Sequence, residues 1–214
     1  MSHIETLEQE AYDFLLPLFS IKDSNSPAVT LTYASSLDAL ISGRNGQQLL
    51  LSGRESMVMT HALRAIHDGI LVGIGTVLND NPSLTVRHVS HLPDGKPVEK
   101  HPRPIILDAK LRIPVNSNVM NRWPIIITSN GGEADDVQTS TFHVLYKDYS
   151  MASIMIEGGA SVIRRQGVHA TGVGSGNTTW ETALKMPELH QVVYKQFGRD
   201  MVIAARILER LPGD

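Results

Sequence analysis

The fold is decided by residues 70–87, which read ILVGIGTVLNDNPSLTVR. The first five residues form a short apolar run bounded by glycine, which is typical of a strand buried on both faces of a parallel sheet. The polar residues that follow predict a turn and the start of a helix. Because open α/β sheets bind ligands at the carboxyl ends of their strands, the same segment is a candidate binding site.

Further apolar runs alternate with loops and helical segments, which predicts an α/β domain with a central, mostly parallel sheet. A helix is expected at residues 2–16. A second helix begins at a capping box of Ser52 and Glu55 and runs to about His67, where Gly69 ends it. The other predicted strands are 28–34, 104–108, 124–128, 142–146 and 153–157, with a short extended segment at 83–87 and a C-terminal antiparallel hairpin at 191–206.

Composition excludes several classes of function. The chain has 214 residues, a formal charge of −3 and no cysteine. Disulfides, thiolate nucleophiles and cysteine-bound zinc are therefore excluded, no histidine spacing suggests another metal site, and a reducing, cytoplasmic location is favoured. The N-terminus lacks the pattern of a signal peptide, and no stretch is apolar enough to span a bilayer, so we expect no membrane partner. Without a basic block, nucleic acid is not an expected partner.

The first candidate site lies within residues 72–87. Gly75 would let a ligand approach the backbone, while Thr76 and Asp80 offer polar groups for a ribose or an amide. Arg87 is a plausible phosphate clamp. The alternative interpretation is a plain strand, turn and helix cap, since the pattern is not the GxGxxG of dinucleotide-binding folds.

Two more strand ends carry candidate residues. At residues 156–161, IEGGAS, Gly158 and Gly159 would expose backbone N–H groups to a pyrophosphate, with Glu157 in the same cleft. The alternative there is a simple glycine turn. At residues 32–42, TYASSLDALIS, Asp38 either caps a helix or faces a substrate.

The order of these segments resembles the riboflavin-biosynthesis reductases, in particular the fungal 2,5-diamino-6-ribosylamino-4(3H)-pyrimidinone 5′-phosphate reductases. The resemblance covers roughly residues 28–163. The segments that carry the resemblance are TYASSLDALIS, LSGRES with THALRAIHDGILVGIGTVLNDNPSLTVR, HPRPIILDAKLRIP and IMIEGGASVI. A further short match lies at KQFGRDMVIAARI.

This resemblance implies a dihydrofolate-reductase-like fold, a single reductase domain over residues 1–214 with an N-terminal helix at 1–21, and a homodimer. It also implies an oxidoreductase that uses NADPH to reduce the ribosyl group of a pyrimidine ribosyl phosphate to a ribityl chain. Asp38, Glu157 or a bound water would supply the proton. The implied cofactor residues are Gly75, Thr76, Asp80, Thr128, Gly158, Gly159, Ala160 and Ser161, and the implied substrate residues are Arg64, Leu84, Arg87 and Glu157.

Residues 164–186 depart from the family pattern. A helix continuation and a further strand are expected there, but the sequence reads as a shortened segment rich in Gly, Ser and Thr. Loss of one strand would leave open sheet edges. The alternative to an active reductase is therefore a catalytically impaired, nucleotide-binding relative with an incomplete sheet.

Overall fold

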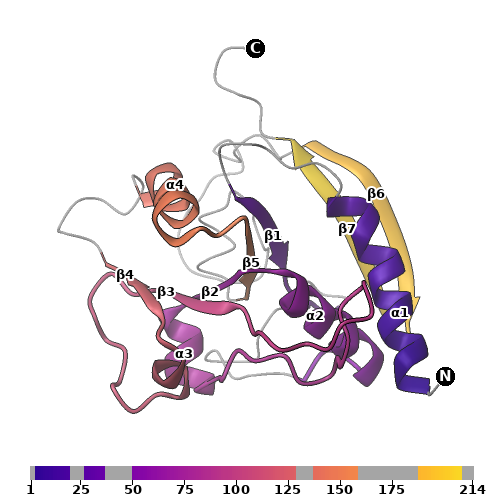
Figure 1. Ribbon diagram of the computed structural model, residues 1–214, viewed down its shortest axis with the longest axis horizontal. Helices are drawn as coiled ribbons and strands as arrows, with labels where there is room; N and C mark the ends of the chain where they lie inside the picture. The colour runs from indigo at the N-terminus through magenta and orange to yellow at the C-terminus, as the bar shows by residue number, and fades with distance from the viewer. Residues whose placement is uncertain (1–2, 20–26, 37–49, 129–136, 159–187, 209–214) are drawn as a thin grey trace.

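The computed structural model describes residues 3–19, 27–36, 50–128, 137–158 and 188–208 (Figure 1). Within these residues, five parallel strands form a central sheet in the order β1-β5-β2-β3-β4. The predicted mostly parallel α/β sheet is confirmed. The strands are β1 (Ala28–Thr32), β2 (Gly69–Gly73), β3 (Arg103–Leu107), β4 (Ile125–Ile127) and β5 (Ser153–Glu157).

The inner strands β5, β2 and β3 contain continuous apolar runs because helices cover both faces of the sheet there, whereas the edge strand β1 is partly exposed. On one face, alternate residues of β2 and β3 pack against Val77 of helix α3 (Ile74–Asp80) and Val119 of the short helix η3 (Asn118–Arg122). On the other face, Leu145 of α4 (Val137–Tyr149) packs on Leu71 and Ile156. Figure 1 shows α3 and α4 on opposite sides of the sheet.

The predicted strand at 142–146 was wrong, because these residues lie within α4. Phe142 and Leu145 face the sheet, whereas His143 and Val144 between them are exposed. Burial at positions three apart is the helical period. A five-residue run of apolar and aromatic residues does not distinguish this pattern from a buried strand.

The capping box predicted at the start of helix α2 (Arg54–Ile66) was wrong, and so was Gly69 as its end signal, whereas the predicted end at about His67 is confirmed, because His67 is the C-cap residue. The helix follows Gly53 and not a Ser52–Glu55 capping box. The Gly53 N–H instead donates to the Asp200 carboxylate at 2.5 Å, and the Ser56 hydroxyl donates to the same oxygen. At the other end, Gly69 belongs to β2. A Cβ on Gly69 would lie 2.9 Å from Ile105 Cδ1, so close packing between strands requires glycine there.

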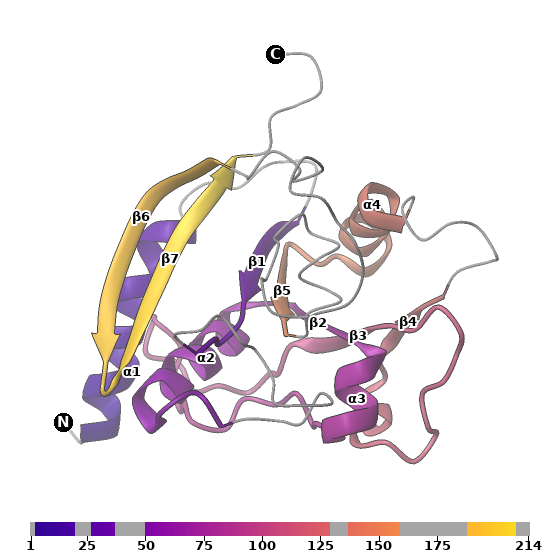
Figure 2. The same ribbon diagram turned by 180° about the vertical axis from the view of Figure 1, so that it is seen from behind.

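The N-terminal helix and the C-terminal hairpin pack together at one end of the molecule (Figures 1 and 2). Helix α1 (His3–Leu15) continues into the short helix η1 (Leu16–Phe19), as the sequence predicts for 2–16. The hairpin of β6 (Glu188–Phe197) and β7 (Asp200–Leu208) confirms the predicted tight turn. Among the described residues it forms a separate two-stranded sheet.

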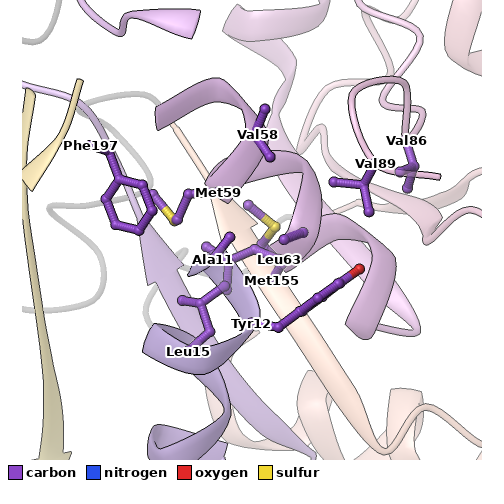
Figure 3. Close-up of a cluster of buried hydrophobic side chains, with 11 residues drawn as sticks. Ala11, Tyr12, Leu15, Val58, Met59, Leu63, Val86, Val89, Met155 and Phe197 are labelled. Carbon is purple, nitrogen blue, oxygen red and sulfur yellow. The ribbon is translucent and has the colours of Figure 1, made fainter. Parts of the chain in front are cut away.

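One hydrophobic cluster joins these parts to the sheet (Figure 3). Phe197 of the hairpin meets Phe14 of α1 edge to face, with ring centroids 5.6 Å apart. The cluster also contains side chains from α2, from β5 and from the loop that follows α3, among them Val58, Met59, Leu63, Met155, Val86 and Val89. Among the residues that the structure describes, no helix combines the length and apolar character needed to cross a bilayer.

Candidate active site

The carboxyl ends of all five parallel strands lie at one edge of the sheet. The predicted polar segments therefore converge, since each follows the end of a strand. In the order of the sheet, these ends are Thr32, Glu157, Gly73, Leu107 and Ile127.

The turn after β2 and the turn after β5 lie next to each other. A Cβ built on Gly158 would lie 3.8 Å from Thr76 Oγ1, with no other atom of the described residues as near. Gly158 has φ +123°, a conformation that side chains rarely adopt, and its N–H donates to the Thr32 carbonyl at 3.2 Å. The space around Gly75 is open for 4 Å. These three predicted residues are thus brought together beside exposed backbone.

Arg64 of α2 reaches across to Glu157 at the end of β5. Its Nε donates to Oε2 at 2.9 Å and its Nη2 donates to Oε1 at 2.6 Å. The Arg64 side chain is buried, whereas a quarter of the Glu157 side chain is exposed. Arg64 Nη1 also donates to the Thr85 carbonyl at 3.0 Å. Every guanidinium nitrogen of Arg64 is thus bonded within the protein, which suits it to hold Glu157 in place more than to bind a phosphate directly.

The predicted substrate residues Leu84 and Arg87 have opposite environments. The Leu84 side chain is buried against Ile74 and Val77, and its backbone has φ +51°. Because its side chain is buried, Leu84 could contact a ligand only through its backbone, and its role in substrate binding stays a prediction. Arg87 is exposed, and its guanidinium has no ion-pair partner within the described parts of the chain.

Asp80 and Thr128 mark the outer limits of the site. Asp80 is the last residue of α3, and partial burial raises the pKa of its carboxyl group. Thr128 is exposed at the end of β4, three strand positions from β5. Strands are roughly 4.8 Å apart, so Thr128 lies about 14 Å from the Gly158 turn measured across the sheet.

Sequence reasoning missed Asp108 at this edge and Arg122, which binds the backbone at Leu84 and just before β3. Asp108 directly follows β3 and is fully buried; its Oδ2 accepts the Ile113 N–H at 2.8 Å, while Oδ1 has no hydrogen-bond partner among the described residues. Its position at a strand end was a signal that could have identified it. Arg122 of η3 donates to the carbonyls of Leu84 and Pro102, both at 3.0 Å, and no local pattern predicted that role.

The expectations for Asp38, Gly159, Ala160, Ser161 and residues 164–186 lie outside the described residues.

Comparison with known proteins agrees with this geometry. The model of the RibD C-terminal domain matches residues 27–170. The 2,5-diamino-6-ribosylamino-4(3H)-pyrimidinone 5′-phosphate reductase of Candida glabrata is 38% identical over 165 residues, which cover 65% of this chain and 68% of that protein. The reductase of the same name from Saccharomyces cerevisiae is 34% identical over 186 residues, covering 75% and 74% respectively.

The chain belongs to the RibD C-terminal domain family. A solved riboflavin biosynthesis reductase of Saccharomyces cerevisiae superimposes with a TM-score of 0.67 at 28% identity, covering 93% of this chain and all of that one. The dihydrofolate-reductase-like fold predicted from sequence is confirmed, and this RibD-family chain is an oxidoreductase.

Proposed function

We propose that this protein uses NADPH to reduce the ribosyl group of 2,5-diamino-6-ribosylamino-4(3H)-pyrimidinone 5′-phosphate to a ribitylamino group, a step of riboflavin biosynthesis. The fungal relatives carry the name of this activity. The observation that carries the proposal is the meeting of two turns, where a Cβ built on Gly158 would lie 3.8 Å from Thr76 Oγ1, beside the Arg64–Glu157 pair.

The residues at the sheet edge fit a reduced dinucleotide. The positive φ of Gly158 and the open space around Gly75 leave backbone accessible on both sides of Thr76. A pyrophosphate needs bare N–H groups, and the Gly158 N–H already donates to the Thr32 carbonyl, so the residues after Gly158 would have to supply them. Thr76 and Asp80 would bind the nicotinamide half, and Thr128, farther along the sheet, the adenosine half. Gly159, Ala160 and Ser161 would extend the pyrophosphate contact from the Gly158 turn.

The chemistry requires one hydride and one proton. NADPH supplies a hydride when bound. In the ring-opened substrate, C1′ is an imine carbon, which takes that hydride while the imine nitrogen takes the proton. The protein's task is then mainly to hold C1′ facing the nicotinamide, because orientation of the two reactants alone lowers the barrier to hydride transfer greatly.

Arg87 and Glu157 would hold the substrate at its two ends. Arg87 is exposed and unpaired within the described residues, so its guanidinium is available to the 5′-phosphate. Both oxygens of Glu157 accept hydrogen bonds from Arg64. This pairing suits Glu157 to accept a hydrogen bond from a substrate hydroxyl or amine and not to donate a proton. Asp38 or a bound water would then donate the proton.

The proposal is tested with purified protein, NADPH and the ribosylamino-pyrimidine phosphate. Oxidation of NADPH with formation of a product heavier by two hydrogens supports it, and NADH in place of NADPH tests the cofactor preference. No cofactor oxidation at any substrate concentration contradicts the proposed reaction.

A second candidate function is a nucleotide-binding relative without turnover. It is favoured by the hairpin, which among the described residues does not join the central sheet. Thermal stabilisation by NADPH without oxidation of the cofactor would support this second function against the first.

We further propose a homodimer that acts in the cytoplasm. The outward side of the hairpin exposes Tyr194, Met201 and Ile203, each by more than half, as an interface would. Analytical ultracentrifugation should give twice the mass of the chain, and a monomer at micromolar concentration would contradict the dimer.

A further inference from the structure

Side chains bind the backbone of the segment Ser83–Arg87, here called the clamped loop. In a strand, the backbone of neighbouring strands would make these hydrogen bonds. It lies in no sheet. Four side chains from three parts of the chain bind its backbone instead. Arg122 donates to Leu84 O at 3.0 Å, Arg64 donates to Thr85 O at 3.0 Å, Val86 N–H donates to His101 Nδ1 at 3.3 Å, and Arg87 N–H donates to His61 Nδ1 at 3.0 Å.

Two of these side chains come from one face of α2. His61 and Arg64 are three residues apart, so their side chains lie one above the other along the helix. Arg64 binds the loop at the Thr85 carbonyl, and His61 binds it at the Arg87 N–H. Val86, between the two contacts, points into the hydrophobic cluster of Figure 3. The backbone is therefore fixed on both sides of Val86, and the exposed Arg87 side chain leaves from a fixed point.

His61 is fully buried, and in the described structure it makes a single hydrogen bond. Because Nδ1 accepts the Arg87 N–H, the ring proton is on Nε2, which has no partner among the described residues. Its ring meets the ring of His88 edge to face at 4.6 Å. Burial, followed by the charges of Arg64, His88 and Arg87, lowers the pKa of His61 to about 3. A neutral imidazole is thus kept in the core at a cost, and its one bond is to the backbone of Arg87.

We propose that His61 is a positioning residue, which sets the Arg87 guanidinium for the substrate phosphate by holding the Arg87 backbone N–H. This inference rests on the proposed function, because it takes Arg87 to be the phosphate clamp. Removal of the Nδ1 acceptor frees the end of the clamped loop and leaves the turns at Thr76 and Gly158 untouched.

Two variants at position 61 separate the acceptor from the bulk of the ring. His61→Leu removes the acceptor and keeps an apolar side chain in the cluster, whereas His61→Asn replaces Nδ1 by an amide oxygen at a similar place. The loss of one buried hydrogen bond corresponds to about a tenfold effect, so KM for the phosphate substrate should rise about tenfold in His61→Leu. The KM for NADPH should stay within about twofold, and His61→Asn should recover most of the loss. Equal losses for both ligands, or no recovery in His61→Asn, would overturn the proposal.

A double-mutant cycle with Arg87→Ala tests whether His61 acts through Arg87. Arg87→Ala keeps the backbone N–H and removes only the guanidinium. If His61 positions that guanidinium, His61→Leu should raise KM no further in the Arg87→Ala background, so the two effects are not additive. Full additivity would show that His61 supports the fold and not Arg87, and would overturn the proposal.

Amide hydrogen exchange of the protein without ligands separates this inference from the proposed reaction. The Arg87 amide should exchange faster in His61→Leu than in the wild type and be protected again in His61→Asn. His67→Leu is the matched control, because buried His67 bonds to Leu63 and Thr30 and does not touch the loop. An Arg87 amide equally protected in wild type and His61→Leu would overturn the inference even if the enzyme is active. If the Arg87 amide loses protection in His61→Leu but the wild type oxidises no NADPH, the contact between His61 and the Arg87 backbone is supported and the proposed reaction is rejected.

Discussion

Arg64 and Glu157 form a two-bond ion pair although 93 positions of sequence separate them, with Nε–Oε2 at 2.9 Å and Nη2–Oε1 at 2.6 Å. The pair ties the last turn of α2 to the end of β5. It therefore joins, by a charged contact, the helix that holds the clamped loop to the strand that carries the Gly158 turn. Its loss should affect both parts of the site.

Arg64→Ala should destabilise the protein because it leaves Glu157 without its partner. Breaking a fully buried pair costs about 3–5 kcal/mol, and the partial exposure of Glu157 reduces the expected loss to about 2–3 kcal/mol. Urea unfolding measures this loss. The double variant Arg64→Met with Glu157→Gln should regain part of the stability, since no unpaired charge remains, but not the activity. A single variant as stable as the wild type would contradict the structural role of the pair.

Gly158→Ala should weaken NADPH binding more than substrate binding. The added Cβ would point toward Thr76 Oγ1 at 3.8 Å, where the cofactor is proposed to pass, and φ +123° strains any side chain by about 1–3 kcal/mol. Gly95→Ala is a matched control, because Gly95 also has a positive φ, with open space around it, in the loop near His91. Both variants should lose stability, but only Gly158→Ala should raise the dissociation constant for NADPH in fluorescence titration. Equal NADPH affinity in the two variants would remove Gly158 from the cofactor site.

The sequence was sufficient to predict the sheet because its inner strands, β5, β2 and β3, are buried on both faces. Runs such as SIMIE at 153–157 are continuous and apolar, and loops of polar residues separate them. The same reasoning failed at 142–146, where a helix with two buried positions has the same composition as a strand. Because parallel strands end at one edge, the meeting of Thr76 with Gly158 also followed from sequence. The roles of these residues stay predictions.

Contacts that depend on tertiary structure could not be predicted in this way. The acceptors of the clamped loop, His61 and His101, lie 26 and 15 residues from the amides that they bind, and no local spacing predicts that they bind them. The partner of the α2 N-terminus, Asp200, lies 147 residues from Gly53. A capping box was expected there because local spacing is all that a single sequence displays, whereas in the folded chain a carboxylate of the hairpin accepts the Gly53 N–H.

Asp200→Ala should destabilise helix α2 and loosen the hairpin turn. Asp200 accepts from the N–H of the N-cap residue Gly53 and from the Ser56 hydroxyl in the first turn, in the way that the carboxylate of a capping box accepts the N-cap N–H. Loss of such a cap costs about 0.5–2 kcal/mol. Urea unfolding should show this loss, and amide exchange should increase at Gly53 and in the first turn of α2. Arg199→Ala is the control, because that exposed side chain makes only a 3.9 Å contact with Asp200, and it should leave the exchange at Gly53 unchanged. If both variants unfold at the wild-type urea concentration, the hairpin does not cap the helix.

The buried His61 should make the stability of the protein fall as the pH falls below about 6.5. Its pKa is lowered to about 3 in the folded state, so the unfolded chain binds the extra proton between these two pH values. A depressed histidine pKa gives stability that is complete above the unfolded value and is lost on acidification toward the folded value. From pH 7 to pH 5 the contribution of His61 should fall by about 2 kcal/mol. His61→Asn does not titrate, so its free energy of unfolding, measured in urea over this range, should fall by about 2 kcal/mol less than that of the wild type. Parallel pH profiles for the two proteins would mean that the His61 ring does not stay neutral in the folded core, and hence that it does not accept the Arg87 N–H across this range.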